Sequence, residues 1–478
     1  MSKRYFYITT TAPYVNADPH IGFALELVQA DAIARFKKLQ GFTVAFGFGT
    51  DEHGLKIYRQ AQEENKLPQD YCDEHVGKFK SLAKALNLST THFIRTTDQK
   101  HVEAAQEFWK RCFQNNDIYK KNYKVKYCVG CELEKTDSEL ENNKCPIHPN
   151  LAIEDYEEEN YFFRFSKYQN RLLQLYNNRP DFVIPSNRLK EIESFVKKGL
   201  HDFSISRLKS KMPWGVPVPG DNDHVMYVWF DALVFYISTL GWPDSLLDFE
   251  KFWPVIHVAG KDNLRQQTAI WQAMLISAGL PGSRQIFIHG FITSDGKKMS
   301  KSLGNVIDPF ELVEQYGVDA VRYYLLKEIP AADDGGFSHS RMKEIYNADL
   351  ANGIGNLVSR VIKLGEDHNV TISDQPEDSI ELPESLNKGG FFDHLEKYEF
   401  NMALEEIWKD FRNLDTEINS DKPWEMDKSQ VAVRLKYYLK EIRKRVKFLK
   451  PFLPNTSDTI MKMTQGKIKK IPPLFPRL

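Results

Sequence analysis

Three lysines lie close together in the segment 295–305, which reads Asp-Gly-Lys-Lys-Met-Ser-Lys-Ser-Leu-Gly-Asn. The segment is polar, contains two serines and two glycines, and follows an apolar, strand-like run at 286–288. Ammonium groups on such a loop can neutralise a polyphosphate whose charge changes during a reaction. Most lysine clusters are only solvated surface, so the phosphate interpretation requires nucleotide-binding sequence elsewhere in the chain.

A second candidate phosphate-binding pattern, Pro19-His20-Ile21-Gly22, follows a strand-like run at 5–10 and precedes residues with helical spacing and a strand-like run at 42–46. Strand, loop, helix and strand in this order predict a parallel α/β sheet, in which ligands bind beyond the carboxyl ends of the strands. His20 would lie at a helix N-terminus, where backbone N–H groups attract anions, and Gly22 would let a flat ring approach the backbone. His20 could instead only cap the helix, and four residues do not decide between the two interpretations.

Cysteine and histidine occur in two closely spaced pairs, Cys128-Val129-Gly130-Cys131 and Cys145-Pro146-Ile147-His148. Each pair has a two-residue gap, which a tetrahedral Zn²⁺ ion requires from two short turns. Four protein ligands (Cys128, Cys131, Cys145 and His148) leave no open coordination position, so the predicted zinc site is structural. Unrelated free thiols are the alternative. Cys72 and Cys112 belong to no such pattern and are expected to be buried small hydrophobes.

Composition sets broader limits. The chain has 478 residues, 42% of them hydrophobic and 27% charged, which is typical of a globular protein with roughly two to four domains. It has no apolar run long enough to span a bilayer and no signal peptide, so a cytoplasmic protein without a membrane role is expected. The segment 434–450 holds eight Lys and Arg residues against one acid, Glu441. It could follow a phosphate backbone or simply be a wet helix face, and charge alone does not decide.

These patterns must be positioned by an α/β fold, in which a Rossmann-like parallel sheet is split by a zinc-containing insertion and followed by an all-α helical bundle. The α/β pattern stops near residue 115 and resumes near 225, and helical periodicity dominates after about 345. The expected domains are therefore 1–115 and 225–345 for the two halves of the sheet, 116–224 for the insertion with the zinc knuckle, and 346–478 for the helices.

The chain resembles the class I aminoacyl-tRNA synthetases, and within them the methionyl-tRNA synthetase family. The two signature motifs of the class stand here as His20-Ile21-Gly22-Phe23 and Lys298-Met299-Ser300-Lys301-Ser302, in the expected order. The likeness covers essentially the whole chain. It includes the zinc knuckle and the segments 14–16, 50–54, 227–229, 260–262, 356–360 and 422–424.

This resemblance implies a two-step reaction. The carboxylate of L-methionine attacks the α-phosphorus of ATP, giving methionyl-adenylate and pyrophosphate, and the methionyl group then passes to the 3′-terminal adenosine of tRNA(Met). Mg²⁺ would accompany ATP, and Zn²⁺ would be the one structural metal. The resemblance implies no protein nucleophile, so catalysis would consist of positioning and charge stabilisation.

The resemblance also assigns roles to residues. His20, Lys298 and Lys301 would be catalytic, through contacts to the phosphates. The expected ATP-binding residues are Pro19, His20, Gly22, Gly260, Asp262, Lys298, Ser300 and Lys301. In the methionine site, Asp51 would bind the ammonium group, with walls from Ala12, Tyr14, Trp229, Ala232 and Tyr236. Asn356, Arg360 and Trp424 would read the anticodon bases. Without the resemblance, Trp229, Tyr236 and Trp424 would be interpreted as packing residues.

The sequence departs from the usual family pattern at three places, one of which is the segment 10–13. The first motif usually ends in His but has Phe23 here, and a Phe-His pair expected after Asp262 is replaced by Gln266-Gln267. Two other functions remain open: a catalytically silent relative that binds tRNA or an amino acid, and a class I synthetase for another aliphatic amino acid. The insertion is too short for a large editing domain, which disfavours the second of these functions. A monomer is expected.

Overall fold

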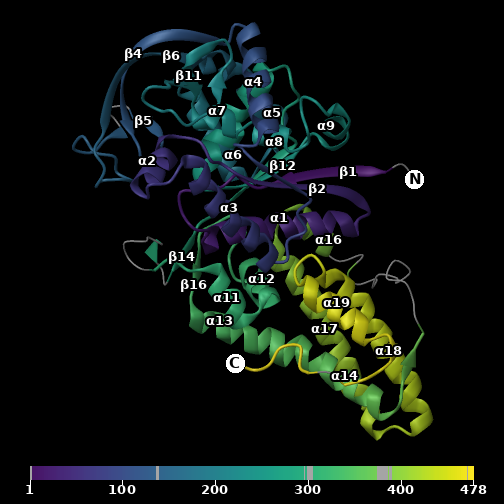
Figure 1. The fold of residues 1–478 in the computed structure, drawn as a ribbon. Coiled ribbons are helices and arrows are strands. Elements are labelled where there is room, and N and C mark those ends of the chain that lie inside the picture. Colours follow the sequence, from purple (N-terminus) through teal and green to yellow (C-terminus); the bar gives the residue numbers. More distant parts are fainter. Residues whose placement is uncertain are drawn as a thin grey trace. The chain divides into compact units, whose positions relative to one another are not determined.

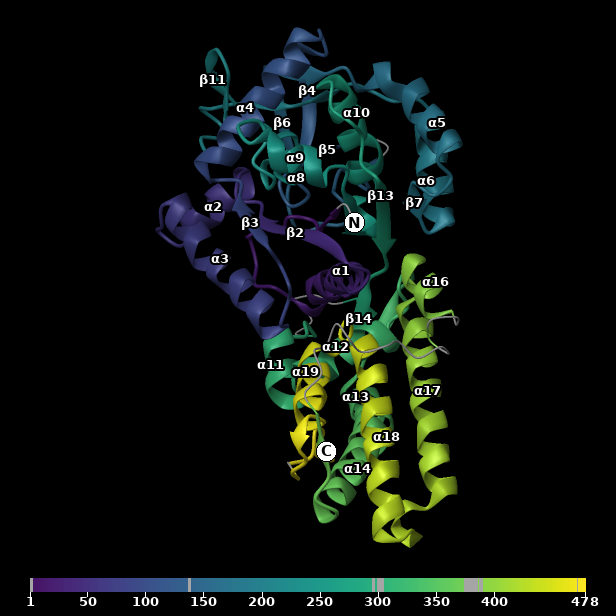
Figure 2. The same cartoon turned by 90° about the vertical axis from the view of Figure 1, so that its right-hand side faces the viewer.

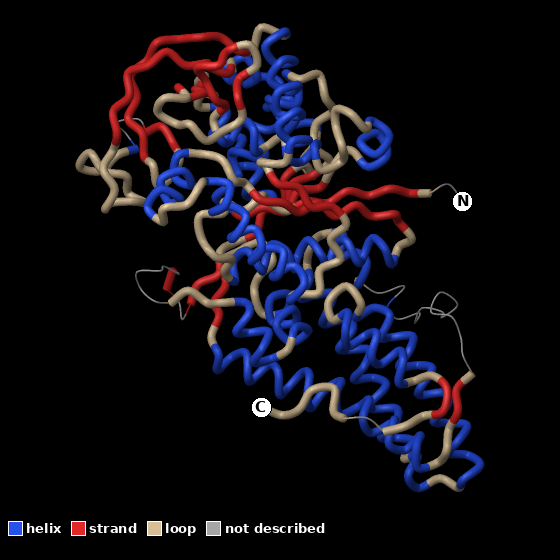
Figure 3. The backbone as a smooth tube through the Cα atoms, viewed as in Figure 1, coloured by secondary structure: helices blue, strands red, loops and turns tan. Residues whose placement is uncertain are grey.

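The computed structural model describes residues 3–135, 139–294, 297–298, 305–373, 386, 390–470 and 472–478. The chain forms two compact units. Unit 1 consists of Met1–Pro19, Phe42–Ser81 and Thr90–Ile288, and unit 2 of His20–Gly41, Leu82–Ser89 and His289–Leu478. Most strands belong to unit 1, whereas unit 2 is mainly helical (Figure 3). Among the described residues, no helix combines the length and the apolar character that crossing a membrane requires.

A six-stranded sheet lies at the core of unit 1 and confirms the predicted α/β class. Its order is β3-β2-β1-β12-β13-β7, with the bounds β1 (Arg4–Thr9), β2 (Phe42–Thr50), β3 (His92–Arg95), β7 (Val183–Ile184), β12 (Ile256–Gly260) and β13 (Gln285–His289). Strand β1 pairs in parallel with both β2 and β12, so strands from both predicted halves of the sheet lie side by side (Figure 1). Strand β7 comes from the predicted insertion and pairs with β13, which the sequence did not indicate.

Aromatic packing fixes the helices of unit 1 that carry candidate site residues. Phe108 of α4 (Gln99–Gln114) stacks on Trp271 of α10 (Trp271–Ser277), with ring centroids 5.6 Å apart. Phe108 also meets Phe230 of α7 (Val228–Ala232) edge-on at 6.0 Å. Burial of such large rings is a main source of packing free energy. It places α7, and with it Trp229 and Ala232, at a defined position. The other α-helices described in unit 1 are α2 (Leu55–Glu63), α5 (Gln169–Asn178), α6 (Ser186–Lys197), α8 (Phe235–Ser238), α9 (Leu246–Phe252) and most of α3 (Pro68–Ala85), whose residues from Leu82 onward belong to unit 2.

A long antiparallel hairpin carries the cysteine segment. Strand β4 (Ile118–Cys128) pairs with β6 (Glu154–Phe163) from Ile118 opposite Phe163 to Tyr127 opposite Glu154. This pairing joins the two ends of the segment 129–153, so the chain between them must turn back on itself. The smaller strands of unit 1 are β5 (Leu133–Lys135), β8 (Phe203–Ser204), β9 (Ser206–Leu208), β10 (Pro217–Val218) and β11 (Asp221–Met226).

Unit 2 is built mainly from helices, as predicted for its C-terminal part. Helices α17 and α18 run side by side (Figure 2). The helices are α1 (Ile21–Leu39), α11 (Pro309–Tyr316), α12 (Val318–Lys327), α13 (His339–Ile345), α14 (Asn356–Asp367), α16 (Phe391–Glu396), α17 (Phe400–Asp421), α18 (Lys428–Val446) and α19 (Pro454–Met463). The short strands are β14 (Ile292–Ser294), β15 (Lys297–Lys298), β16 (Gly335–Phe337), β17 (Thr371–Ile372) and β18 (Gly466–Lys467). The antiparallel pair β17–β18 is an addition to the expected all-helical region.

Three arginines of the basic segment on α18 form contacts within unit 2. Arg443 is buried and donates to the carbonyl of Met461 at 2.6 Å. Arg445 is also buried and forms an ion pair with Asp410 at 2.7 Å. Arg434 pairs with Glu417 at 2.6 Å. For these three residues the contacts favour a structural role over tracking of a phosphate backbone.

A buried ion pair joins distant segments of unit 2. The Arg322 guanidinium is fully buried and lies 2.7 Å from the Asp31 carboxylate of α1. It also donates to the carbonyls of Leu86 at 3.1 Å and Phe452 at 2.8 Å. Burial alone would raise the pKa of Asp31, but Arg322 and Arg35 hold it below its ordinary value. The stabilisation is therefore present above the ordinary pKa of the carboxyl group and is lost as the pH falls through the lowered value.

We expect Asp31→Asn to lower the free energy of unfolding at neutral pH by about 3–5 kcal/mol, because it leaves the buried Arg322 charge without its partner. Urea denaturation followed by circular dichroism measures this. Glu74→Gln is the matched control, because Glu74 is the exposed partner of Lys66 and its loss should not change stability measurably. If Asp31→Asn were as stable as this control, the pair would not hold unit 2 together.

Candidate active site and metal cluster

Asp51 follows β2 and has an unsatisfied, buried carboxylate. Its backbone N–H donates to the Pro13 carbonyl at 2.9 Å and its carbonyl accepts from Val15 N–H at 3.1 Å, which places Tyr14 opposite Asp51. The carboxylate is 8% exposed, and its Oδ1 has no hydrogen-bond partner among the described residues. Burial raises the pKa of Asp51 well above its ordinary value, and nearby Asp231 raises it further. A cationic ligand would supply the missing partner.

Asp231 on α7 is a second buried acid that the sequence analysis did not select. Its Oδ2 lies 2.7 Å from Nδ1 of His53, whereas its Oδ1 has no partner among the described residues. Burial raises the pKa of Asp231, and His53 lowers it only in part. The signal was present in the sequence, because an acid within the apolar run Tyr227-Val228-Trp229-Phe230 is expected to be either buried or functional.

The residues predicted to line the methionine site all belong to unit 1. Tyr236 is buried, and its ring meets that of His257 edge-on, with centroids 4.3 Å apart. The Tyr236 hydroxyl accepts a hydrogen bond from Nε2 of Gln267. One of the two glutamines that differ from the family pattern therefore contacts a predicted methionine-binding residue. The Gln267 Oε1 is buried without a partner among the described residues. Ala12 packs against the same apolar core as Tyr236, and Trp229 and Ala232 are half-buried on α7.

Gly260 and Asp262 occupy the position where a parallel sheet binds ligands. Strand β12 ends at Gly260, and the 3₁₀ turn Lys261–Asn263 follows it directly. Gly260 is buried, whereas Asp262 is exposed and accepts from the amide of Asn263 at 3.2 Å. Pro19, at the end of the N-terminal segment of unit 1, is buried.

In unit 2, His20 forms the N-cap of α1. Its Nδ1 accepts from the backbone N–H of Gly22 at 3.1 Å, so the capping alternative is present in the structure. A Cβ on Gly22 would lie only 3.0 Å from the His20 ring, so the close approach of this ring to the backbone favours glycine at position 22. The backbone N–H of Phe23 donates to the His20 carbonyl at 3.0 Å. The N–H of Ile21 donates to the Ile307 carbonyl at 3.2 Å, which ties this helix start to the chain just after the lysine segment.

The lysine segment is described only in part. Lys298 lies in β15, with its backbone opposite Thr293 of β14. Ser300 and Lys301 lie outside the described residues. The structure therefore connects the start of α1, beside His20, to Ile307, just after this segment, but not to the lysine side chains.

The four predicted metal ligands converge. Their ligand atoms all lie within 4.8 Å of one another. Nδ1 of His148 is 3.2 Å from Sγ of Cys131 and 3.8 Å from Sγ of Cys128, and the Sγ atoms of Cys131 and Cys145 are 3.4 Å apart. Three thiols and an imidazole at such separations fit the edges of a tetrahedron around one metal ion. Unrelated thiols would not meet in this way.

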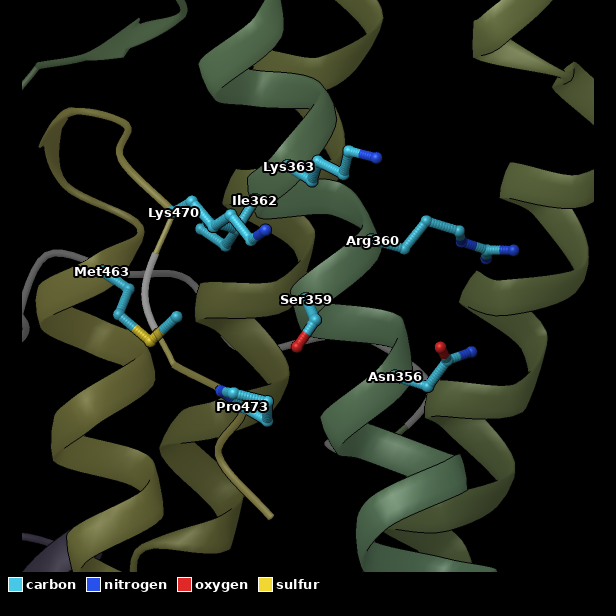
Figure 4. A pocket seen from close by; sticks show the side chains of 8 residues that line it. All are labelled: Asn356, Ser359, Arg360, Ile362, Lys363, Met463, Lys470 and Pro473. Carbon is cyan, nitrogen blue, oxygen red and sulfur yellow. The ribbon is translucent and has the colours of Figure 1, made fainter. Parts of the chain in front are cut away.

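Two of the predicted base-reading residues share one face of α14. Figure 4 shows Asn356 and Arg360 projecting the same way from this helix, beside a hollow of about 320 Å³. The Arg360 guanidinium contacts α17, where it pairs with Asp415 at 2.5 Å and donates to Asn419 at 2.7 Å. Trp424 lies five residues beyond Asn419 and is 49% exposed, as a stacking platform requires.

Comparisons with known proteins agree on one family. A family profile described as tRNA synthetases class I (M) matches residues 6–156 and 130–362. A methionine–tRNA ligase from a Nostoc species is 42% identical over 96% of this chain and 89% of its own length. The enzyme of the same name from Thermosynechococcus vestitus is 50% identical over 75% of this chain and 69% of its own.

Solved structures extend the comparison to three dimensions. Mycobacterium tuberculosis methionyl-tRNA synthetase in complex with methionyl-adenylate is 35% identical, with a TM-score of 0.89 over 99% of this chain and 100% of that one. The apo form of that enzyme has a TM-score of 0.82 at 32% identity, over 100% of this chain and 99% of that one.

The metal cluster depends on a glycine. A Cβ at Gly130 would lie 2.5 Å from Cγ of the His148 ring, so Gly130→Ala should displace the imidazole. We expect the wild-type protein, purified without chelator, to contain about one equivalent of zinc and this variant to contain much less. Elemental analysis by mass spectrometry measures both. Gly77→Ala is the control, because a Cβ there meets nothing within 4 Å. Full zinc content in Gly130→Ala would show that the imidazole is not a ligand.

Proposed function

The chain belongs to the methionine family of class I tRNA synthetases, and on this premise we propose how its residues divide the work of charging a tRNA. The protein activates methionine with ATP and transfers the methionyl group to tRNA. The observation that best supports our residue assignment is the Asp51 carboxylate, which is buried near Asp231 and whose Oδ1 has no hydrogen-bond partner in the described part of the chain. The ammonium group of an amino acid is the cation that would satisfy it.

The methionine site comprises Asp51, Tyr14, Tyr236, Ala12, Trp229 and Ala232. A thioether packs well against the edges of aromatic rings, and the tyrosines and the tryptophan provide such edges. The hydrogen bond from Gln267 holds the Tyr236 hydroxyl, so this chain orients that ring with an amide where its relatives usually have an imidazole. The buried, unpartnered Gln267 Oε1 makes this end of the site more polar.

The first step needs positioning and charge neutralisation rather than a protein nucleophile. A methionine carboxylate oxygen forms a bond to the α-phosphorus of ATP while the bond from that phosphorus to the pyrophosphate oxygen breaks. Because Gly22 N–H donates to Nδ1 of His20, the neutral imidazole carries its proton on Nε2 and can donate it in a hydrogen bond to a phosphate oxygen. Lys298, Ser300 and Lys301 would neutralise the leaving pyrophosphate, with Mg²⁺ bound to ATP.

The remaining ATP contacts come from Pro19, Gly22, Gly260 and Asp262. The exposed Asp262 carboxylate, just beyond the carboxyl end of β12, is suited to ribose hydroxyls. In the second step a hydroxyl of the 3′-terminal adenosine of tRNA(Met) attacks the methionyl carbonyl, and AMP leaves. The sheet halves 1–115 and 225–345 would perform both steps.

Zn²⁺ would be held by Cys128, Cys131, Cys145 and His148 within the insertion 116–224, and it supplies structure because four protein ligands leave no open position. None of the five cysteines forms a disulfide, which supports a reducing compartment such as the cytoplasm. The helical domain 346–478 would read the anticodon through Asn356, Arg360 and Trp424. The Arg360 guanidinium must then exchange Asp415 and Asn419 for a base or phosphate.

The assay that tests this function is amino-acid-dependent exchange of pyrophosphate with ATP over a panel of amino acids. We expect exchange with methionine and none in the absence of an amino acid. Failure with every amino acid would favour a catalytically silent tRNA-binding relative, and a preference for leucine, isoleucine or valine would indicate a different class I synthetase.

Trp424→Ala tests the separation between anticodon reading and chemistry. Loss of one stacked base should reduce the kcat/KM of tRNA charging by about ten- to a hundred-fold, because each such stack contributes about 1–3 kcal/mol. Methionine-dependent pyrophosphate exchange should stay nearly unchanged. Phe113→Ala, which removes an equally exposed ring from α4 in unit 1, is the control and should alter neither assay. Equal loss of charging and exchange in Trp424→Ala would contradict the anticodon role.

A further inference from the structure

Glu132 connects the turn at residues 128–131, which we call the metal turn, to the proposed methionine site. It follows the ligand Cys131 directly and is 4% exposed. Its Oε1 accepts from the backbone N–H of Lys56 at 2.6 Å and from the Tyr14 hydroxyl at 3.2 Å. Its Oε2 accepts from the Tyr127 hydroxyl, and its backbone carbonyl accepts from the Tyr227 hydroxyl. One residue of the knuckle therefore binds four segments of unit 1 that lie far apart in the sequence.

The backbone of Glu132 adopts a conformation that its residue type disfavours. Glu132 has a φ of +52°, in the left-handed region that disfavours residues other than glycine and asparagine. Of the nine non-glycine residues with positive φ in the described part of the chain, six are asparagine. A turn that needed only this backbone conformation would be expected to use Gly or Asn. Glutamate persists because its side-chain contacts offset the strain.

Tyr14 is held at two points, and Glu132 is one of them. Its backbone is fixed opposite Asp51, the proposed partner of the methionine ammonium group. Its hydroxyl is fixed by Glu132, and Gly54 gives it room, because a Cβ on Gly54 would lie 2.7 Å from that hydroxyl. Gly54 itself has a φ of +111°, so another side chain there would be strained as well. The ring of Tyr14 thus has a set position relative to Asp51.

We propose that Glu132 is a positioning residue for amino-acid binding. It fixes the Tyr14 ring against the methionine side chain, and it makes the affinity for methionine depend on the geometry of the metal turn. Glu132 does not touch the reacting atoms in this mechanism and acts only through Tyr14. The inference rests on the proposed assignment of Tyr14 to the methionine site.

The test compares Glu132→Ala, Glu132→Gln and Tyr14→Phe, singly and combined, with methionine binding measured by calorimetry. Glu132→Ala should raise the methionine Kd by about ten-fold or more, the usual effect of losing a hydrogen bond to a charged group. Glu132→Gln keeps an oxygen acceptor and should recover most of the affinity. In a Tyr14→Phe background, Glu132→Ala should have little further effect, because the hydroxyl that it positions is already absent.

Further measurements separate positioning from a general loss of structure. The KM for ATP in pyrophosphate exchange and the zinc content of Glu132→Ala should stay close to those of the wild type, whereas the melting temperature should fall, because the buried donors of Lys56, Tyr14 and Tyr127 lose their acceptor. Glu141→Ala, which removes an exposed carboxylate from the same knuckle, is the matched control and should leave methionine affinity unchanged. If Glu132→Ala loses zinc or fails to fold, Tyr14→Phe decides, because it removes the hydroxyl that Glu132 binds and leaves Glu132 in place; an unchanged methionine Kd in Tyr14→Phe overturns the proposal.

The outcomes also distinguish this inference from the function on which it rests. A wild-type protein that does not bind methionine would overturn the proposed methionine site. Normal wild-type binding that is unchanged in both Glu132 variants would overturn only the positioning role. Equal increases in the methionine Kd and the ATP KM would assign Glu132 to general stability instead.

Discussion

The cost of burying a carboxylate in a protein interior is the constraint on which the proposed site in unit 1 depends. Three acids there, Asp51, Asp231 and Glu132, are almost completely buried, and each meets this cost differently. Glu132 accepts three hydrogen bonds on its carboxylate, whereas Asp231 has the imidazole of His53 on one oxygen. The Oδ1 of Asp51 has no hydrogen-bond partner among the residues that the structure describes. A site preorganised in this way gains most from a ligand that brings a positive charge, because the desolvation of the acid has already occurred during folding.

Unit 2 also contains a buried carboxylate, Asp31, but there the protein itself supplies the hydrogen-bond and charge partners. Asp31 is as deeply buried as Asp51, but Arg322, Arg35 and the N–H of Ser89 satisfy it within the protein. The favourable interaction of Asp31 with Arg322 therefore stabilises the packing of α1, α12 and the chain before α19, and it leaves no unsatisfied charge for a ligand. This matters for chemistry because His20 is the N-cap of α1, so the pair that anchors the middle of the helix also fixes the position of the N-terminal end, where we propose the phosphate contact.

The spacing of residues in the sequence was enough to predict those features whose residues lie close together in the chain. Two pairs with two-residue gaps predicted the Cys-His cluster, and the spacing of Asn356 and Arg360 predicted a shared helical face. The parallel sheet followed from the alternation of strand and helix patterns. The sequence could not show that Glu132 meets Tyr14, because that contact joins residues 118 positions apart and depends on how the hairpin folds back. Strand β7 and the pair β17–β18 were missed for a related reason, since two-residue strands carry no periodicity of their own.

Arg360 shows how a side chain can be both structurally paired and available for recognition. Its guanidinium is bound to Asp415 and Asn419 on α17, which keeps the planar fork beside Asn356 instead of leaving it to sample many rotamers. An ion pair with solvent-exposed partners contributes about 0–1 kcal/mol, so its exchange for a base or a phosphate costs little. The entropy of ordering a long side chain, by contrast, has largely been lost before tRNA arrives. On our proposal that Arg360 reads the anticodon, the pair with Asp415 would therefore prepare the side chain for that role and would not obstruct it.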